Sequence, residues 1–326
     1  MRITEFRVAG LLVGLITALL APSVAHAQAW PQHPVRLIVP LQPGSGPDLT
    51  ARLFAERLAV KWGQPVYVEN RQGADGIPAV TTFLGAHDNH TLLLSFAGVI
   101  SINPYIHDKL PYDPAADLVP ICPVADYFLA VAASPALKLT SLEQLVMLAR
   151  AQPGKLNWAA SPGLPEYVFA SLQKSASISM TEVAYRDFNQ ALTDLGEGRI
   201  QAAATGLPSF MPHVQAGRAK LLVLPGRERS PPAPGVPTAR EAGYPDLTFD
   251  ATGGLFGWRD MPADLKARIG ADVREAALDA SLGARLTSVG AALHAGTAAD
   301  FAASIEQQRA KIAAIIRSGH GPNRAQ

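Results

Sequence analysis

The chain has 326 residues, with 28 Lys and Arg against 27 Asp and Glu and a formal net charge of +1 at pH 7. This balance is not typical of proteins that bind nucleic acids or anionic membrane surfaces, because those carry an excess of positive charge. Cys122 is the single cysteine, so no internal disulfide forms, and its apolar surroundings predict a buried, inert thiol.

The first 27 residues have the features of a secretory signal peptide. Arg2 and Arg7 flank the start of an apolar stretch over residues 8–20, and residues 25–27 (Ala-His-Ala) fit the small-x-small cleavage pattern. Cleavage there would remove two basic and one acidic residue and leave 26 of each. An uncleaved signal anchor is the alternative. We therefore expect an exported protein, located in a bacterial periplasm, that has lost residues 1–27.

The remaining chain alternates strand and helix patterns. Short apolar runs rich in β-branched residues predict strands over residues 35–41, 66–69, 91–96, 128–133, 156–161, 182–185, 200–205, 219–224 and 249–257. Amphipathic spacing predicts helices over residues 49–62, 78–86, 141–150, 165–175, 187–196, 208–216, 262–278, 281–289 and 298–318. Strands separated by helices indicate βαβ units and an α/β fold with a mostly parallel sheet.

Residues 35–48 are the most informative segment, because a buried strand, a glycine-rich turn and a helix start follow one another there. Gly44 and Gly46 permit a sharp turn and leave no Cβ to block a ligand, so we expect a bulky side chain at Gly46 to prevent binding. Asp48 is predicted to be the N-cap of a helix that begins near Leu49. Backbone N–H groups at such a helix start favour an anion.

Residues 156–165 repeat this order of strand, Gly/Pro turn and helix start about 120 residues later, with Pro165 suited to the first helical position. In open α/β sheets, ligands bind beyond the carboxyl ends of the strands. Two lobes that face each other would place both turns at one cleft, where a small anion could lie between two helix N-termini. The alternative is that both are ordinary βα turns.

An exported enzyme that uses the turn at Gly44 and Gly46 is the alternative function. A dinucleotide-binding loop would need a third glycine where Leu49 stands, and Ser45 lacks the frame of a nucleophile elbow. His87 and His90 flank a turn and would need further ligands to hold a metal ion. We therefore predict no catalytic residue, no metal site and no cofactor.

Short motifs distributed over nearly the whole mature chain carry a family resemblance. They lie, in chain order, at residues 30–48, 63–74, 102–104, 109–114, 153–157, 191–195, 207–209, 212–213, 216–218, 236–238 and 241–243. In their order and spacing these motifs resemble the Bug-type (TctC-like) extracytoplasmic solute receptors of tripartite tricarboxylate transporters.

The resemblance implies a type II periplasmic-binding-protein fold, an α/β architecture in which two lobes enclose a ligand cleft. Lobe 1 would comprise residues 28–126 and 248–326, and lobe 2 would comprise residues 127–247. Crossovers are expected near residues 125–128 and 247–249. Such receptors close on a small carboxylate and deliver it to a membrane permease. We expect this protein to be a monomer.

The resemblance also implies ligand contacts from strand ends and loops in both lobes. The site residues expected on this basis are Gln42, Pro43, Gly44, Ser45, Gly46, Asp48, Ser95, Ala97, Gly98, Ser161, Gly163, Glu166, Tyr167, Asp187 and Thr205.

The second-lobe side departs from the family pattern. Glu166 and Asp187 stand where small neutral residues are usual, so a ligand with one carboxylate and an amine or an aromatic ring should fit better than citrate. Helix capping by both acids is the alternative. Phe96, Tyr167 and Phe188 would either cover the apolar part of the ligand or belong to the core.

Overall fold

The computed structural model describes residues 30–319, so the expected signal peptide lies outside the described residues. By internal contacts the chain divides into residues 1–32 and residues 33–326, and the fold below belongs to the second unit. Over the described range, none of the helices combines the length and the apolar character that a membrane span needs.

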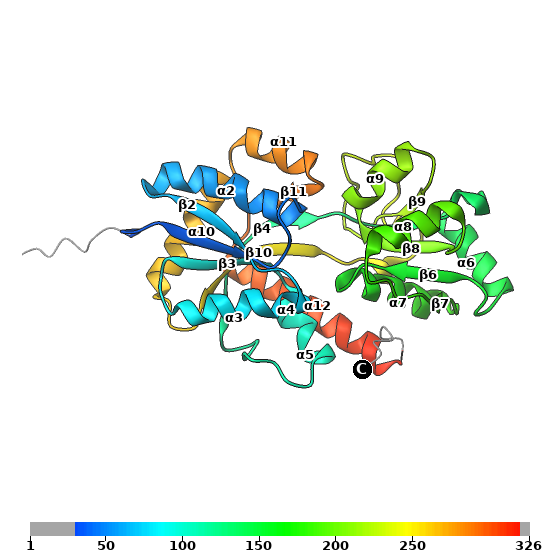
Figure 1. The fold of residues 1–326 in the computed structure, drawn as a ribbon, viewed down its shortest axis with the longest axis horizontal. Helices are drawn as coiled ribbons and strands as arrows, with labels where there is room; N and C mark the ends of the chain where they lie inside the picture. The colour runs from blue at the N-terminus through cyan, green and yellow to red at the C-terminus, as the bar shows by residue number, and fades with distance from the viewer. Residues whose placement is uncertain (1–29, 320–326) are drawn as a thin grey trace, which may run out of the picture. The chain divides into compact units, whose positions relative to one another are not determined.

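One mixed α/β layer is built on a six-stranded sheet with the strand order β11-β4-β10-β3-β1-β2 (Figure 1). Its strands are β1 (Val35–Val39), β2 (Val66–Asn70), β3 (Thr91–Phe96), β4 (Leu118–Tyr127), β10 (Ala251–Trp258) and β11 (Ala291–Leu293). The helices in the same part of the chain are α2 (Gly46–Trp62), η1 (Ala74–Gly76), α3 (Ile77–Ala86), α4 (Gly98–Ser101), α5 (Asn103–Ile106), α10 (Ala263–Ala276), α11 (Ala280–Ser288) and α12 (Ala298–Arg317).

A second sheet has five strands in the order β7-β6-β8-β5-β9. These strands are β5 (Leu129–Ala133), β6 (Asn157–Ala160), β7 (Thr181–Glu182), β8 (Ala202–Gly206) and β9 (Lys220–Val223). Its helices are η2 (Pro135–Leu137), α6 (Leu142–Ala151), α7 (Leu164–Ala176), α8 (Phe188–Glu197), α9 (Leu207–Gln215) and η3 (Pro245–Leu247). Two sheets with their own helices confirm the predicted two-lobed α/β fold; the lobes are named lobe 1 and lobe 2 in this order.

Each predicted strand and helix overlaps an observed one, but β4 and β11 are missing from the sequence prediction. Pro120 and Pro123 interrupt β4, and a proline cannot donate a hydrogen bond to a neighbouring strand. The structure accommodates them because the pairing of β4 with β10 shifts register between Gly253 and Gly254 and again between Leu255 and Phe256.

The prediction of a mostly parallel sheet is wrong. β1 pairs in parallel with β2 and β3, whereas β10 pairs antiparallel with both β3 and β4. In lobe 2, β5 is antiparallel to β8 and β9. The reason lies in the connections: β4 continues into the second sheet and β10 returns from it, so these two linking strands run in opposite directions.

The helix starts differ slightly from those predicted. Helix α2 begins at Gly46 with Ser45 as its N-cap, so the prediction that Asp48 caps it is wrong. Asp48 is instead the third helical residue. Helix α7 begins at Leu164, which puts Pro165 in the second position. Both helices therefore share a proline followed by an acid in their first turn.

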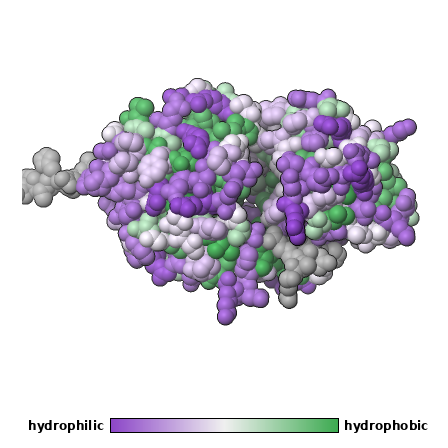
Figure 2. All heavy atoms as spheres, in the orientation of Figure 1, coloured by the Kyte–Doolittle hydropathy of each residue, from purple (hydrophilic) through white to green (hydrophobic). Residues whose placement is uncertain are grey.

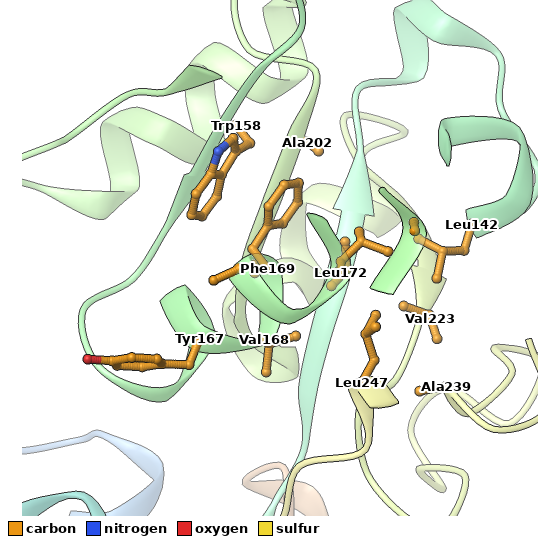
Figure 3. Packing of buried hydrophobic residues seen from close by; sticks show 14 of the residues in the cluster. Leu142, Trp158, Tyr167, Val168, Phe169, Leu172, Ala202, Val223, Ala239 and Leu247 are labelled. Atoms are coloured by element: carbon orange, nitrogen blue, oxygen red, sulfur yellow. The ribbon is translucent and has the colours of Figure 1, made fainter. Parts of the chain in front are cut away.

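Aromatic packing fixes the core of lobe 2, where the Trp158 and Phe169 rings stack with centroids 4.2 Å apart and an interplanar angle of 6° (Figure 3). Tyr167 is fully buried in the same cluster. Ile312 and Ile315 of α12 also belong to this cluster, so the C-terminal helix helps to build the lobe 2 core. Because α12 also contacts β4 and α4, it links the two lobes.

Candidate ligand-binding site

The first-lobe loop, residues 42–48, connects the carboxyl end of β1 to helix α2. Gln42, Pro43 and Gly44 are exposed, and Gly44 has a left-handed φ of 81° that favours glycine. The Ser45 hydroxyl donates to the Gln42 carbonyl at 2.7 Å and does not cap the helix. The first N–H groups of α2 therefore have no capping side chain, and an N-terminus of this kind attracts anions.

Asp48 holds the first-lobe loop from within. Its carboxylate accepts hydrogen bonds from the Gly44 N–H at 2.8 Å, from Asn70 Nδ2 at 2.9 Å and from Arg52 Nε at 3.0 Å. Burial by itself would raise the pKa of Asp48, but the bonds from Arg52, Gly44 and Asn70 outweigh it and lower that pKa. Asp48, at 1% exposure, is thus enclosed by the loop that it orders.

Gly46 lies close to protein atoms from other parts of the chain. A Cβ at this position would lie 3.3 Å from the Val289 carbonyl oxygen and 3.7 Å from the Tyr127 ring. A side chain at Gly46 would therefore press against the Val289 carbonyl group and pack on the Tyr127 ring. Among the loop glycines, it is Gly44 whose Cβ direction is open, with nothing within 4 Å.

The end of β3 lies beside the first-lobe loop, because β1 and β3 are parallel neighbours and end at the same edge of the sheet. Ser95 is 2% exposed, and its hydroxyl has no hydrogen-bond partner within residues 30–319. Ala97 is buried and Gly98 begins the short helix α4. The half-buried Phe96 ring meets the Tyr127 ring edge-on, with centroids 5.0 Å apart.

In lobe 2, Ser161 and Thr205 come together at the ends of the parallel neighbours β6 and β8. The Thr205 hydroxyl donates to Ser161 Oγ at 2.9 Å, and Thr205 is buried. The Ser161 N–H donates to the Ala204 carbonyl at 3.0 Å, which fixes the start of the second-lobe loop, residues 161–168. This end of the site thus offers neutral hydroxyl groups.

Glu166 and Asp187 both serve as helix caps. Glu166, the third residue of α7, accepts with Oε2 from the N–H of the N-cap residue Gly163 at 3.1 Å. Asp187 is the N-cap of α8 and accepts from the Asn189 N–H at 3.0 Å. Glu166 is buried, whereas Asp187 is exposed. Each carboxylate thus balances the positive end of its own helix.

The three aromatic side chains considered in the sequence analysis differ in how deeply they are buried. Tyr167 is fully buried in the lobe 2 core, so its ring offers no surface to a ligand in this conformation. Phe188 is partly buried against the second core cluster of lobe 2. Phe96 is half-buried, and its ring contacts that of Tyr127, which itself lies against the first-lobe loop at Gly46.

Tyr127, Val289 and Gly290 connect the two halves of the site, and sequence reasoning missed all three. Tyr127 touches the Cβ position of Gly46, and the adjacent Phe128 N–H donates to the Gly290 carbonyl at 3.2 Å. A Cβ on Gly290, whose φ is 77°, would fall 2.0 Å from Cγ of Pro208. The only sequence signals were an aromatic residue at the expected lobe boundary and a glycine after a helix.

The surface is hollowed between the part that carries the six-stranded sheet and the part that carries the five-stranded sheet (Figure 2). In Figure 2 hydrophilic side chains dominate the faces on both sides of this hollow, whereas hydrophobic colour is found deeper within it. The strand ends described above belong to these two parts.

The histidines and the cysteine that the sequence analysis considered lie apart from one another. Within residues 30–319, no cluster of three or more His, Cys, Asp or Glu side chains is arranged to hold a metal ion. The His87 ring packs edge-on against Trp258, and the His90 ring lies 5.3 Å from that of His33. Burial raises the pKa of the Cys122 thiol to about 12, which confirms an inert cysteine.

Comparisons with known proteins agree on one family. The family described as "Tripartite tricarboxylate transporter family receptor" (TctC) matches residues 50–320. The protein BugT of Bordetella pertussis is 33% identical over 237 residues, which cover 72% of this chain and 72% of BugT.

Two solved structures from Rhodopseudomonas palustris are similar in fold and sequence. One, solved with adipate, is 26% identical with a TM-score of 0.78, over 89% of this chain and 98% of that chain. The other, MatC with bound malate, is 27% identical with a TM-score of 0.72, over 86% of this chain and 99% of that chain.

Proposed function

Because this chain belongs to the TctC family of tripartite tricarboxylate transporter receptors, we propose that it captures a small carboxylate-bearing molecule between its two lobes. It would then deliver that molecule to a membrane permease. The relatives solved with adipate and with malate support a carboxylate as the common group of the ligand. We also propose that the protein acts as a monomer in the periplasm, after its signal peptide has been cleaved near Ala27.

The proposal rests mainly on the structure of the first-lobe loop. Asp48 orders the loop from within through three hydrogen bonds, while the start of α2 keeps no side-chain cap. Arg52 balances the charge of Asp48, so the helix N-terminus stays favourable for an anion. We infer that the ligand carboxylate binds the backbone of residues 42–46, with the buried Ser95 hydroxyl close by.

The second lobe would bind the other end of the ligand. Ser161 and Thr205 supply neutral hydroxyl groups. Gly163 has no side chain, so a ligand can approach the backbone there. Capping engages only one carboxylate oxygen of Asp187, whose side chain remains exposed. We therefore propose a ligand with one carboxylate and a hydrogen-bond donor or an aromatic ring at its far end, rather than a plain dicarboxylate.

Motion between the lobes would accompany binding. We propose that lobe 1 comprises residues 28–126 with 248–326, and that lobe 2 comprises residues 127–247. The chain passes from β4 to β5 at Tyr127 and returns ahead of β10 at residues 248–250. Two short crossovers permit hinge closure, which small-angle X-ray scattering would detect as a smaller radius of gyration when ligand saturates the protein.

The alternative of an exported enzyme is not favoured by Ser45. Its hydroxyl donates to the Gln42 carbonyl at 2.7 Å, which is the role of a turn residue and not of an activated nucleophile. The family consists of receptors. Turnover of an ester or of a nucleotide by the purified protein would contradict this part of the proposal.

A thermal-shift and calorimetry screen tests the proposal. The panel pairs each acid with its neutral amide, for example malate with malamide and benzoate with benzamide, and adds amino acids. We expect at least one acid to raise the melting temperature while its amide does not, because the α2 N-terminus selects the negative charge. Equal shifts for acid and amide would refute the carboxylate site.

A further inference from the structure

A cavity of about 360 Å³ lies away from the strand ends of the proposed ligand site. Its walls come from three segments: the stretch after β9, the crossover at residues 248–250, and helix α12, coloured orange to red in Figure 1. The crossover forms one wall, so whatever occupies this cavity touches the connection between the lobes.

The cavity is rich in positive charge. Arg227, Arg240 and Lys311 line it, against a single carboxylate from Asp250. Arg227 Nε is paired with Asp250 Oδ2 at 2.7 Å, which uses up that negative charge. Two cations therefore remain without a carboxylate of their own on the cavity wall.

The two remaining cations differ in their surroundings. Arg240 is exposed, and its guanidinium makes no hydrogen bond or ion pair with any other residue of the described range. Lys311 Nζ donates to the Thr248 carbonyl at 2.6 Å and lies 4.0 Å above the centroid of the Phe249 ring. Burial lowers the pKa of Lys311, although Asp246 and Asp250 oppose that effect, so its charge is poorly compensated.

Two polar groups on the cavity wall lack partners, and buried polar groups are normally satisfied. Thr248 Oγ1 is buried and makes no hydrogen bond within residues 30–319. Gln308 is only 8% exposed, and its amide likewise makes none with the rest of the described chain. A hydroxyl and an amide are the donors that, beside cations, complete the shell of an oxyanion.

We propose that this cavity is a second binding site, which takes a small oxyanion such as a carboxylate or a phosphate. Arg240 and Lys311 supply its charge, and Thr248 and Gln308 supply neutral hydrogen-bond donors. The bound anion connects the crossover to α12 and thereby stiffens the hinge. This site is independent of the ligand site between the lobes, which uses residues 42–48 and 161–168.

Backbone-amide NMR of the full mature protein, titrated with inorganic phosphate at constant ionic strength, tests the proposal. We expect shift changes at residues 248–250 and 304–311 that saturate. Acetate in a parallel titration should move the same signals, because the site recognises the oxyanion and not the phosphorus. Changes confined to residues 42–49, or equal changes with chloride, would overturn the proposal.

Variants locate the site. Arg240→Gln should weaken phosphate binding about tenfold or more, because an unpaired guanidinium makes strong charge-assisted bonds to an oxyanion. Gln308→Leu should weaken it about threefold, because a neutral hydrogen bond is lost. Arg218→Gln, a change at an exposed arginine outside the cavity, is the matched control and should leave affinity unchanged. Equal affinity in wild type, Arg240→Gln and Gln308→Leu would also overturn the proposal.

Discussion

The starts of helices α2 and α7 share a sequence pattern but differ in what they offer a ligand. In each, a glycine-containing turn follows a strand, a proline occupies the second helical position and an acid occupies the third. Asp48 is bound to Arg52 one turn further along α2 and to Asn70 of strand β2, whereas Glu166 accepts only from the nearby Gly163 N–H among the bonds described above. The same local motif thus builds a loop that is tied to strand β2 in one lobe and a helix start that is held only by its own turn in the other.

The largest effect should come from removing the acid of lobe 1. Asp48→Ala leaves the Gly44 N–H, the Asn70 amide and the Arg52 guanidinium without their buried acceptor, so the free energy of unfolding should fall by about 3 kcal/mol. Glu166→Ala, the matched change in lobe 2, removes one cap and should cost only about 1 kcal/mol. Urea denaturation measures both. Equal losses would show that the two acids play the same role.

The turn glycines provide the next comparison. Gly163 has φ 92° and ψ −135°, a region that side chains rarely enter, so Gly163→Ala should lower the free energy of unfolding by ~1–3 kcal/mol. Gly44→Ala should lower the free energy of unfolding by about 1–2 kcal/mol, because alanine is strained at a φ of 81°. The added Cβ meets nothing within 4 Å, so no clash adds to this cost.

Gly283→Ala is the control for these two variants. Gly283 lies inside helix α11 with an open Cβ position, so the change should stabilise the protein by about 0.5–1 kcal/mol. A larger loss from Gly44→Ala than from Gly163→Ala would reverse the predicted order of strain in the two turns.

Ligand preference tests whether the acids of lobe 2 also act on the ligand. Glu166→Gln and Asp187→Asn keep an oxygen acceptor for capping but remove the charge. If these charges face the ligand, each variant should bind a plain dicarboxylate about fivefold more tightly relative to an amino or aromatic monocarboxylate, which corresponds to roughly 1 kcal/mol. Calorimetric titrations with both ligand classes give the ratio, and an unchanged ratio in both variants would show that the acids only cap helices.

The smallest effect concerns the junction of the lobes. His294 Nδ1 lies 2.9 Å from Asp126 Oδ2, and this carboxylate, against the opposing effect of burial, raises the pKa of His294. A raised pKa in the folded state stabilises the protein fully below the unfolded value of about 6.5, and the stabilisation is lost as pH rises through the folded pKa.

The free energy of unfolding should therefore fall by roughly 0.5 kcal/mol or less between pH 6 and pH 8 because of this pair, which is partly exposed. Asp126→Asn should remove that part of the pH dependence, although the Thr252 hydroxyl that donates to Asp126 Oδ1 at 2.6 Å would still find an acceptor. Parallel denaturation series of both proteins measure the difference. An identical pH profile in the variant would contradict the assignment.

The sequence by itself determined most of the elements and their order, although not β4 and β11. The apolar runs, the glycine stops and the amphipathic spacing located every predicted strand and helix, because these signals act over a few neighbouring residues. Motif order also led to the family that the comparisons show. The burial of Cys122 follows the same logic, because the apolar residues around it in the sequence predict it.

Only the tertiary structure decided how those elements act together. The sequence pattern does not predict strand β4, because its two prolines disfavour a strand. The strand forms because β10 pairs with it through shifted registers. The role of Gly46 depends on Tyr127 and Val289, which lie far away in the sequence. Asp48 and Glu166 look alike along the chain, and they differ because Asn70, 22 residues from Asp48, accompanies Arg52 in binding only the first of them. Contacts of this kind depend on which segments the fold brings together, and local sequence patterns carry no information about that.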